Sequence, residues 1–124
     1  ASAEPGRYRT DRTPYMRAIM DALSPGNAAR RIVFMKAAQV GATEAGNNWI
    51  GYVIHHAPGP MLAVQPTVEL AKRFSRQRID PLIAESPVLR ERVKPQRSRA
   101  AGNTVLSKEF PAGLLVITGA NSAV

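Results

Sequence analysis

Apolar residues recur with a helical period in some segments of this chain and form short unbroken runs in others. After Thr13 and Pro14, apolar residues stand three and four positions apart until the turn-forming residues 24–27. Thr13 can cap a helix, and Pro14 suits its first position because the N–H that proline lacks has no partner there. The pattern predicts a one-sided helix packed on a core from Pro14 to Leu23.

The next apolar segment is a short β-favouring run, Arg31–Met35, which is typical of a buried parallel strand. Lys36 follows it directly. From Thr43 to His56 the apolar positions return to the helical period, and the Pro- and Gly-rich residues 57–60 end that element. Residues 36–43 therefore lie between a predicted strand and a predicted helix.

The second half of the chain contains further strands and helices, in an order that indicates the fold class. The predicted elements are a strand at 61–64, a helix capped by Thr67 that runs to about Ile79 and bends past Pro81 to Glu85, a helix at 88–93, and strands at 104–110 and 114–118. A basic loop, 94–103, precedes the last two strands. This order predicts an α/β domain with a central, largely parallel sheet flanked by helices.

Composition fits one compact domain with a basic surface. The chain has 124 residues, of which 44% are hydrophobic and 21% charged, as in globular proteins. Lys and Arg exceed Asp and Glu by 17 to 9, so the formal net charge is +8 and polyanions are favoured as partners. With no cysteine, disulfide frameworks and thiolate metal sites are excluded. No apolar run approaches the ~20 residues of a membrane span, so we expect a soluble intracellular protein.

The octapeptide 36–43, KAAQVGAT, combines the residue types that a phosphate-binding loop needs. Small side chains let phosphate oxygens approach backbone N–H groups, a lysine supplies positive charge, and a hydroxyl at the helix start can reach Mg²⁺. In the common pattern GxxxxGK[ST] the lysine stands next to the hydroxyl residue, whereas here Ala42 occupies that place and Lys36 the first. Small residues between a strand and a helix are also common in α/β proteins that bind no phosphate. The spacing alone leaves both interpretations open.

Beyond spacing, the chain resembles the ATPase domain of large terminase subunits of tailed phages, specifically the lambda-like group. That family has a deviant phosphate loop with the lysine at its start, matched here by Lys36, Gly41 and Thr43. Upstream, Gly6-Arg7-Tyr8 and residues 14–20 are similar to the family's adenine-contacting segment and first helix. Downstream, residues 62–67 and 118–122 resemble its second strand with exit loop and the loop before its acidic strand.

This resemblance implies a P-loop NTPase-like fold and a role for each loop residue. Lys36 would be the catalytic residue that binds the β and γ phosphates, Thr43 would help to bind Mg²⁺, and Gly41 would permit close approach of the backbone. Tyr8 would stack on adenine, and Gln39 would contact phosphate or sense it. The implied ATP-binding set is Tyr8, Lys36, Ala37, Ala38, Gln39, Val40, Gly41, Ala42 and Thr43.

The resemblance also implies an activity and partners for the parent protein. It would be a phage- or prophage-encoded motor in the bacterial cytoplasm that hydrolyses ATP with Mg²⁺ to package double-stranded DNA into the procapsid. Its partners would be the small terminase subunit and the procapsid portal, with oligomerisation possible and no membrane involved. The family's strand ending in paired carboxylates appears nowhere in the sequence. We therefore expect an arm at 1–12 and the front part of an ATPase domain at 13–124, inactive alone, with the acidic strand and the nuclease domain absent.

Two other functions remain open. A helicase-like DNA translocase would suit the loop and the Gln65-Pro66-Thr67 turn, although such enzymes generally keep lysine where Ala42 stands. A non-enzymatic basic module for DNA binding or assembly would suit the cationic stretch from Lys72 to Arg99, which is either a solvated surface or a contact for the DNA backbone.

Three other features of the sequence have simpler interpretations. His55 and His56 are adjacent, and a helix-end role is favoured over metal binding because neighbouring helical residues point in different directions. Trp49 is expected to pack in the core. Glu44 suits the positive end of the helix dipole.

Overall fold

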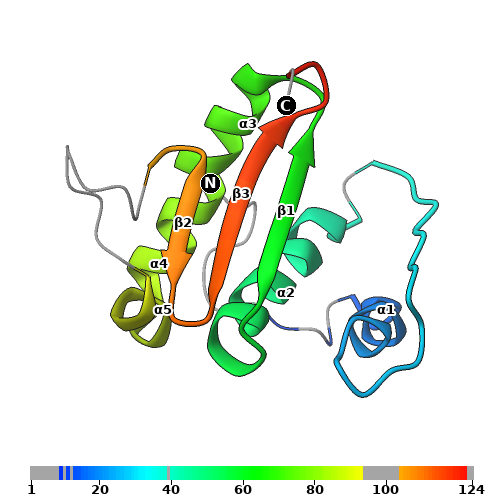
Figure 1. Cartoon of the computed structure of the whole chain (residues 1–124). Coiled ribbons are helices and arrows are strands. Elements are labelled where there is room, and N and C mark those ends of the chain that lie inside the picture. The colour runs from blue at the N-terminus through cyan, green and yellow to red at the C-terminus, as the bar shows by residue number, and fades with distance from the viewer. Residues whose placement is uncertain (1–8, 10, 12, 39, 94–103, 123–124) are drawn as a thin grey trace. The chain divides into compact units, whose positions relative to one another are not determined.

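The computed structural model describes residues 9, 11, 13–38, 40–93 and 104–122 (Figure 1). The chain divides into two compact units, Ala1–Trp49 and Ile50–Val124. The boundary falls within helix α2, Ala42–His56. No helix in the described ranges is long and apolar enough to cross a membrane.

The first unit contains α1, Met16–Ala22, which starts later than the sequence predicts. The Met16 N–H donates to the Thr13 carbonyl at 2.9 Å, so Thr13, Pro14 and Tyr15 form a turn before the helix. Tyr15, and not Thr13, occupies the N-cap position, and its side chain makes no capping bond. The helix ends at the predicted place, before the turn at 24–27.

The predicted strand Arg31–Met35 is wrong, because residues 31–37 form no regular element. Val33 and Met35 are 83% and 95% exposed, so the expected burial is absent as well. A strand forms only where a neighbouring strand accepts and donates its backbone hydrogen bonds, and none of the described strands pairs with this segment. β-propensity without a partner therefore leaves an extended, irregular segment.

The second unit is built on a mixed sheet of three strands among the described residues (Figure 1). The strands are β1 (Pro60–Gln65), β2 (Ser107–Phe110) and β3 (Gly113–Gly119), in the order β1-β3-β2. β1 and β3 are parallel, with Leu62 opposite Val116, whereas β2 and β3 are antiparallel. The α/β class is confirmed, but the observed sheet has one parallel and one antiparallel pair and is not largely parallel.

A nearly continuous helical stretch follows β1 on one face of the sheet (Figure 1). It consists of α3 (Val68–Phe74), the π-helical segment η2 (Ser75–Ile79) and α4 (Asp80–Glu85), and α5 (Pro87–Arg92) comes next. Its continuation past Pro81 to Glu85, the short helix after Ser86 and the last strand agree with the sequence prediction, whereas β2 begins at Ser107 and not at the predicted Thr104. Lys94 to Asn103, the predicted basic loop, lies outside the described residues.

The π-helical segment keeps one face of this stretch against the sheet. Ala71, Ser75 and Ile79 are spaced four residues apart, and all three are fully buried. In a regular α-helix, positions four apart drift steadily around the axis, because one turn takes 3.6 residues. A π turn takes more residues and reverses the drift. The three side chains consequently stay in line over the sheet.

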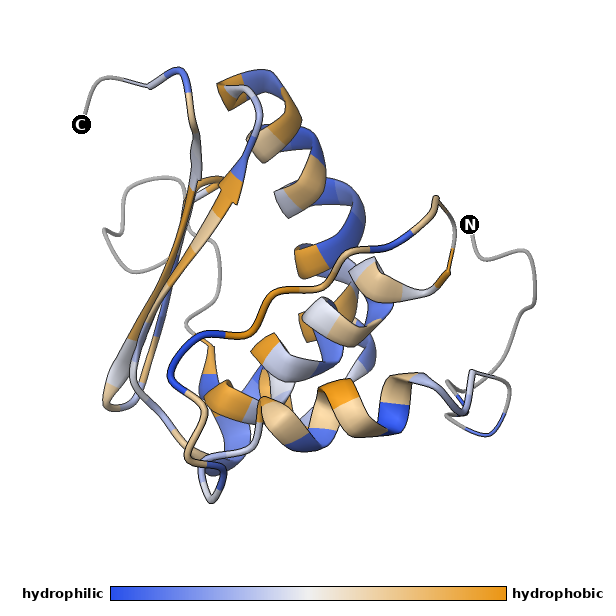
Figure 2. Ribbon diagram, turned by 90° about the vertical axis from the view of Figure 1, so that its right-hand side faces the viewer, coloured by the Kyte–Doolittle hydropathy of each residue, from blue (hydrophilic) through white to orange (hydrophobic). Residues whose placement is uncertain are grey.

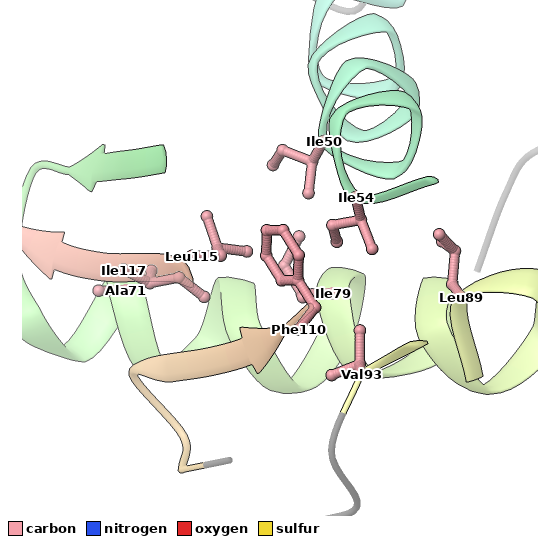
Figure 3. Packing of buried hydrophobic residues seen from close by; sticks show 9 residues of the cluster. All are labelled: Ile50, Ile54, Ala71, Ile79, Leu89, Val93, Phe110, Leu115 and Ile117. Carbon is pink, nitrogen blue, oxygen red and sulfur yellow. The ribbon is translucent and has the colours of Figure 1, made fainter. Parts of the chain in front are cut away.

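Nine buried hydrophobic residues form the core of this second unit (Figure 3). They come from the last turns of α2, from the helices after β1, and from β2 and β3: Ile50, Ile54, Ala71, Ile79, Leu89, Val93, Phe110, Leu115 and Ile117. Lys108 is also fully buried, and its Nζ lies 2.7 Å from the Asp80 carboxylate and 2.8 Å from the Thr104 carbonyl. Burying a charge is tolerable only with such partners.

Candidate functional site

The candidate phosphate loop, residues 36–43, lies in the first unit and ends at the start of α2. Lys36, Ala37 and Ala38 are exposed. The Lys36 ammonium makes only a long contact of 3.4 Å, with the neighbouring Ala37 carbonyl. Since this contact is weak, the ammonium can leave it and bind a phosphate at little cost in free energy. However, the irregular segment before Lys36 does not place it at a strand end, contrary to the prediction.

Gly41 gives the loop its turn into α2. Its φ is +86°, in the left-handed region that side chains other than glycine rarely adopt. A Cβ at this position would meet only Thr13 Cγ2 at 3.8 Å, so the backbone angle and not space requires glycine. The Gly41 carbonyl accepts the Ala45 N–H at 3.0 Å, which begins the helical hydrogen-bond pattern. The turn directs the chain so that Ala42 and Thr43 open the helix.

Thr43 and Glu44 occupy the first turn of α2. Thr43 is exposed, so its hydroxyl is accessible to a metal ion bound to phosphate, and Glu44 is half-buried at the positive end of the helix dipole, as predicted. No group of three or more His, Asp or Glu residues in the described part of the chain could bind a metal ion. A magnesium ion here would thus depend on Thr43 and on the phosphates themselves.

Tyr15 is a loop contact that the sequence analysis missed. Its hydroxyl donates a hydrogen bond of 2.8 Å to the Val40 carbonyl, 25 residues further along the chain. Tyr15 lies within the apolar period that predicts the first helix, but its side chain is 52% exposed. No local signal could reveal this bond, because it depends on the path of the chain between α1 and α2. Tyr15 fixes the loop directly before Gly41.

Trp49 connects the two helices of the first unit. Its Nε1 donates to the Leu23 carbonyl at 3.1 Å, directly after the end of α1. The indole is 38% exposed, so it packs less deeply than the predicted core position. Tyr15 and Trp49 together anchor both the loop and its helix to the α1 region.

Two of the predicted ATP contacts, Tyr8 and Gln39, lie outside the described residues. The other candidates are residues 36–38 and 40–43. They lie near one another because they are neighbours along the chain. The described strands end at Gln65, Phe110 and Gly119, so none of them ends in paired carboxylates.

The carboxyl ends of the parallel strands β1 and β3 form a closely packed junction. The Asn121 side-chain oxygen accepts the Val68 N–H at 3.1 Å, and the Ala120 N–H donates to the Gln65 carbonyl at 2.8 Å. Thr67 caps α3 as predicted, because its hydroxyl accepts the Leu70 N–H at 3.2 Å. The two segments that sequence resemblance singled out, 62–67 and 118–122, are therefore joined by hydrogen bonds.

The adjacent histidines stand in the last turn of α2 and near other cations. Nδ1 of His55 and Nε2 of His56 lie 3.1 Å apart. Partial burial, the neighbouring His56 and the charge of Arg92 lower the pKa of His55. Both histidines stand at the end of the helix, as the sequence predicts.

Comparison with known proteins gives the family. The chain matches the phage terminase large subunit gpA ATPase domain over residues 2–124. It is 28% identical over 114 residues to the terminase large subunit of Enterobacteria phage P21. This alignment covers 92% of the chain but only 17% of that relative. No solved structure matches. The chain thus belongs to the phage terminase large subunit family, and its residues 2–124 match the ATPase domain of that family.

Proposed function

We propose that this chain is the ATP-binding portion of a terminase large subunit, the motor that hydrolyses ATP to package viral DNA into a procapsid. The observation that supports this function best is the match to the ATPase domain over residues 2–124. The spacing of Lys36, Gly41 and Thr43 agrees with a lysine-first phosphate loop. The parent protein works in the cytoplasm of the bacterial host, with double-stranded DNA, a small terminase subunit and a portal as partners.

Each loop residue has a role that its chemistry supports. The exposed Lys36 ammonium binds the β and γ phosphates, and Gly41 lets the backbone approach them. N–H groups at residues 37–43 donate to phosphate oxygens at the start of α2. The Thr43 hydroxyl would be a ligand of Mg²⁺, as in other phosphate loops. Tyr8 and Gln39 add the adenine and phosphate contacts.

Hydrolysis needs carboxylates, and none of the strands in the described part of the chain ends in a pair of them. In phosphate-loop enzymes an acidic residue at a strand end helps to hold the metal ion, and a further residue orients the attacking water. The nine acidic residues of the sequence include no pair at the end of an apolar run. We expect this chain to bind ATP without turning it over, and the full-length motor to need the further acidic strand.

Calorimetric titration with ATP and Mg²⁺ tests the assignment. Lys36→Ala should weaken ATP binding at least ~10-fold, because a charge-assisted hydrogen bond contributes about 1.5–3 kcal/mol. Thr43→Ala should remove the Mg²⁺ dependence and Thr43→Ser should retain it. Lys72→Ala is the matched control, an exposed lysine of the second unit that should leave binding unchanged.

The full-length parent gives the decisive measurement. Lys36→Ala in that protein should abolish ATP hydrolysis, and an unchanged rate would reject the phosphate-loop assignment. A chain that binds random DNA but no ATP would support the non-enzymatic module instead. Turnover by the isolated chain would show that its carboxylates suffice.

A further inference from the structure

The cationic stretch that begins at Lys72 is divided by the structure into side chains with different surroundings. Lys72, Arg73, Arg76 and Arg78 are exposed on α3 and η2. Arg90 donates to the Ala84 carbonyl at 3.4 Å, and Arg92 is half-buried beside His55. Lys94, Arg97 and Arg99 lie outside the described residues. Only the first four cations form an exposed set on one helical stretch, which we call the α3–η2 ridge.

The ridge owes its exposure to the same π-helical segment that aligns the buried face. With Ala71, Ser75 and Ile79 fixed against the sheet, the positions between them remain on the outer sides of the helix. Lys72 and Arg76 are one turn apart and share a side. In Figure 2 the helix that begins beside the tip of β1 shows blue, hydrophilic bands on the side turned away from the strands.

The acidic residues nearest to the ridge do not neutralise it. Asp80 stands four residues after Arg76, the spacing of an intrahelical ion pair, but its carboxylate lies 2.7 Å from the buried Lys108 ammonium of β2. Glu69 stands four residues before Arg73, and the described residues contain no ion pair between them. Within the described part of the chain, no hydrogen bond or ion pair engages the four ridge cations.

The chemistry of the ridge fits a phosphate backbone better than an acidic protein. No large apolar side chain of residues 72–79 is among the exposed ones, whereas protein interfaces have an apolar, often aromatic centre. The exposed neighbour within the ridge, Gln77, is polar, and the one aromatic residue of this stretch, Phe74, is partly buried against the core. Flexible cations without base-reading neighbours make contacts that position a duplex but do not read its sequence.

We propose that the α3–η2 ridge is a contact site for the phosphate backbone of double-stranded DNA. The contact is independent of sequence, because it consists of Lys72, Arg73, Arg76 and Arg78 acting as charges on phosphates. This inference rests on the proposed packaging function, and it identifies the element that contacts the DNA during packaging. Lys108 acts as a positioning residue, since it withdraws the Asp80 carboxylate from the ridge.

The test measures binding of a random-sequence DNA duplex to this chain at several salt concentrations, without nucleotide. The double variant Arg73→Gln/Arg76→Gln should bind roughly 10-fold or more weakly at ~0.1 M salt and lower the salt slope by about two, because each phosphate contact contributes close to one unit. The control Arg17→Gln/Arg30→Gln removes the same charge from exposed arginines of the first unit and should change the slope far less. Circular dichroism melting should be unchanged for both, as expected for surface substitutions.

Three results would overturn the proposal. Equal losses in both double variants would show a diffuse effect of net charge. Unchanged DNA binding by the ridge variant would place the contact elsewhere. Loss of polyglutamate binding with retention of DNA binding would identify an acidic protein partner. Lys36→Ala should leave DNA binding intact, so a failure of ATP binding rejects the proposed function without affecting this readout.

Discussion

Gly119 ends β3 where the chain passes the start of α3, and Gly119→Ala is expected to be strongly destabilising. A Cβ at this position would lie far inside van der Waals contact with the Val68 nitrogen and the Thr67 carbonyl carbon, and 2.8 Å from the Asn121 side-chain oxygen. Two of these three atoms belong to the backbone, so no side-chain rotation can relieve the clash. The junction between the ends of β1 and β3 must move.

The cost has two parts. Overpacking a close contact costs about 1–3 kcal/mol. The shift would also break the 3.1 Å hydrogen bond from Val68 to Asn121, which contributes about 0.5–1.5 kcal/mol. Together the free energy of unfolding should fall by about 1.5–4.5 kcal/mol, a large part of the stability of a small domain.

Urea denaturation followed by circular dichroism measures this loss. Gly46→Ala is the matched control, because it adds the same methyl group inside α2, where nothing lies within 4 Å. It should stabilise the chain by about 0.5–1 kcal/mol, through helix propensity. If Gly119→Ala unfolds at the same urea concentration as the unsubstituted chain, the close approach of β3 to α3 is refuted.

Further predictions concern the loop, the cap, the turn and pH. Tyr15→Phe removes the hydrogen bond to the Val40 carbonyl and should weaken ATP binding about 2- to 10-fold, as measured by calorimetry. Unchanged ATP binding would show that this hydrogen bond does not hold the loop in place. Thr67→Ala should lower the free energy of unfolding measured in urea by about 1 kcal/mol. Thr67→Ser should lose much less, because serine keeps the hydroxyl that caps α3. Ala112 has a φ of 64°, which strains a residue that carries a Cβ, so Ala112→Gly should stabilise the chain by about 0.5–1 kcal/mol. A loss of stability in this variant would show that the backbone at Ala112 is not strained. The lowered pKa of His55 means that the unfolded chain takes up its proton first as pH falls from 7 toward 5. Stability should fall over that range, and less steeply in His55→Gln; parallel pH profiles would disprove this.

Local chemistry in the sequence was sufficient for much of the fold. Thr67 caps α3 and Ser86-Pro87 begins α5 because capping depends on neighbours along the chain. α2 follows the apolar period from Thr43 to His56 and gains Ala42 because Gly41 turns the backbone just before it. The strands at 61–64 and 114–118 were predicted correctly because each finds a partner within the chain.

Segments whose structure depends on distant partners were not predictable. The apolar runs 31–35 and 61–64 look alike in the sequence, but only the second pairs with β3. Even in β1, Leu62 and Val64 remain 66% and 53% exposed, because the helices cover one face of the sheet. An apolar run shows that a segment can form a strand, and cannot show on which sides it will be covered.

The sequence by itself determined the lysine-first pattern of the candidate phosphate loop, since Lys36, Gly41 and Thr43 define that pattern by residue type and spacing. It also determined the excess of positive charge. Only the tertiary structure decided that Tyr15 anchors the loop and that Lys108 binds Asp80, leaving the cations of α3 and η2 exposed. The physical reason is that loop chemistry is encoded in neighbouring residues, whereas the pairing of charges and hydrogen bonds depends on which distant side chains the fold brings within about 3 Å.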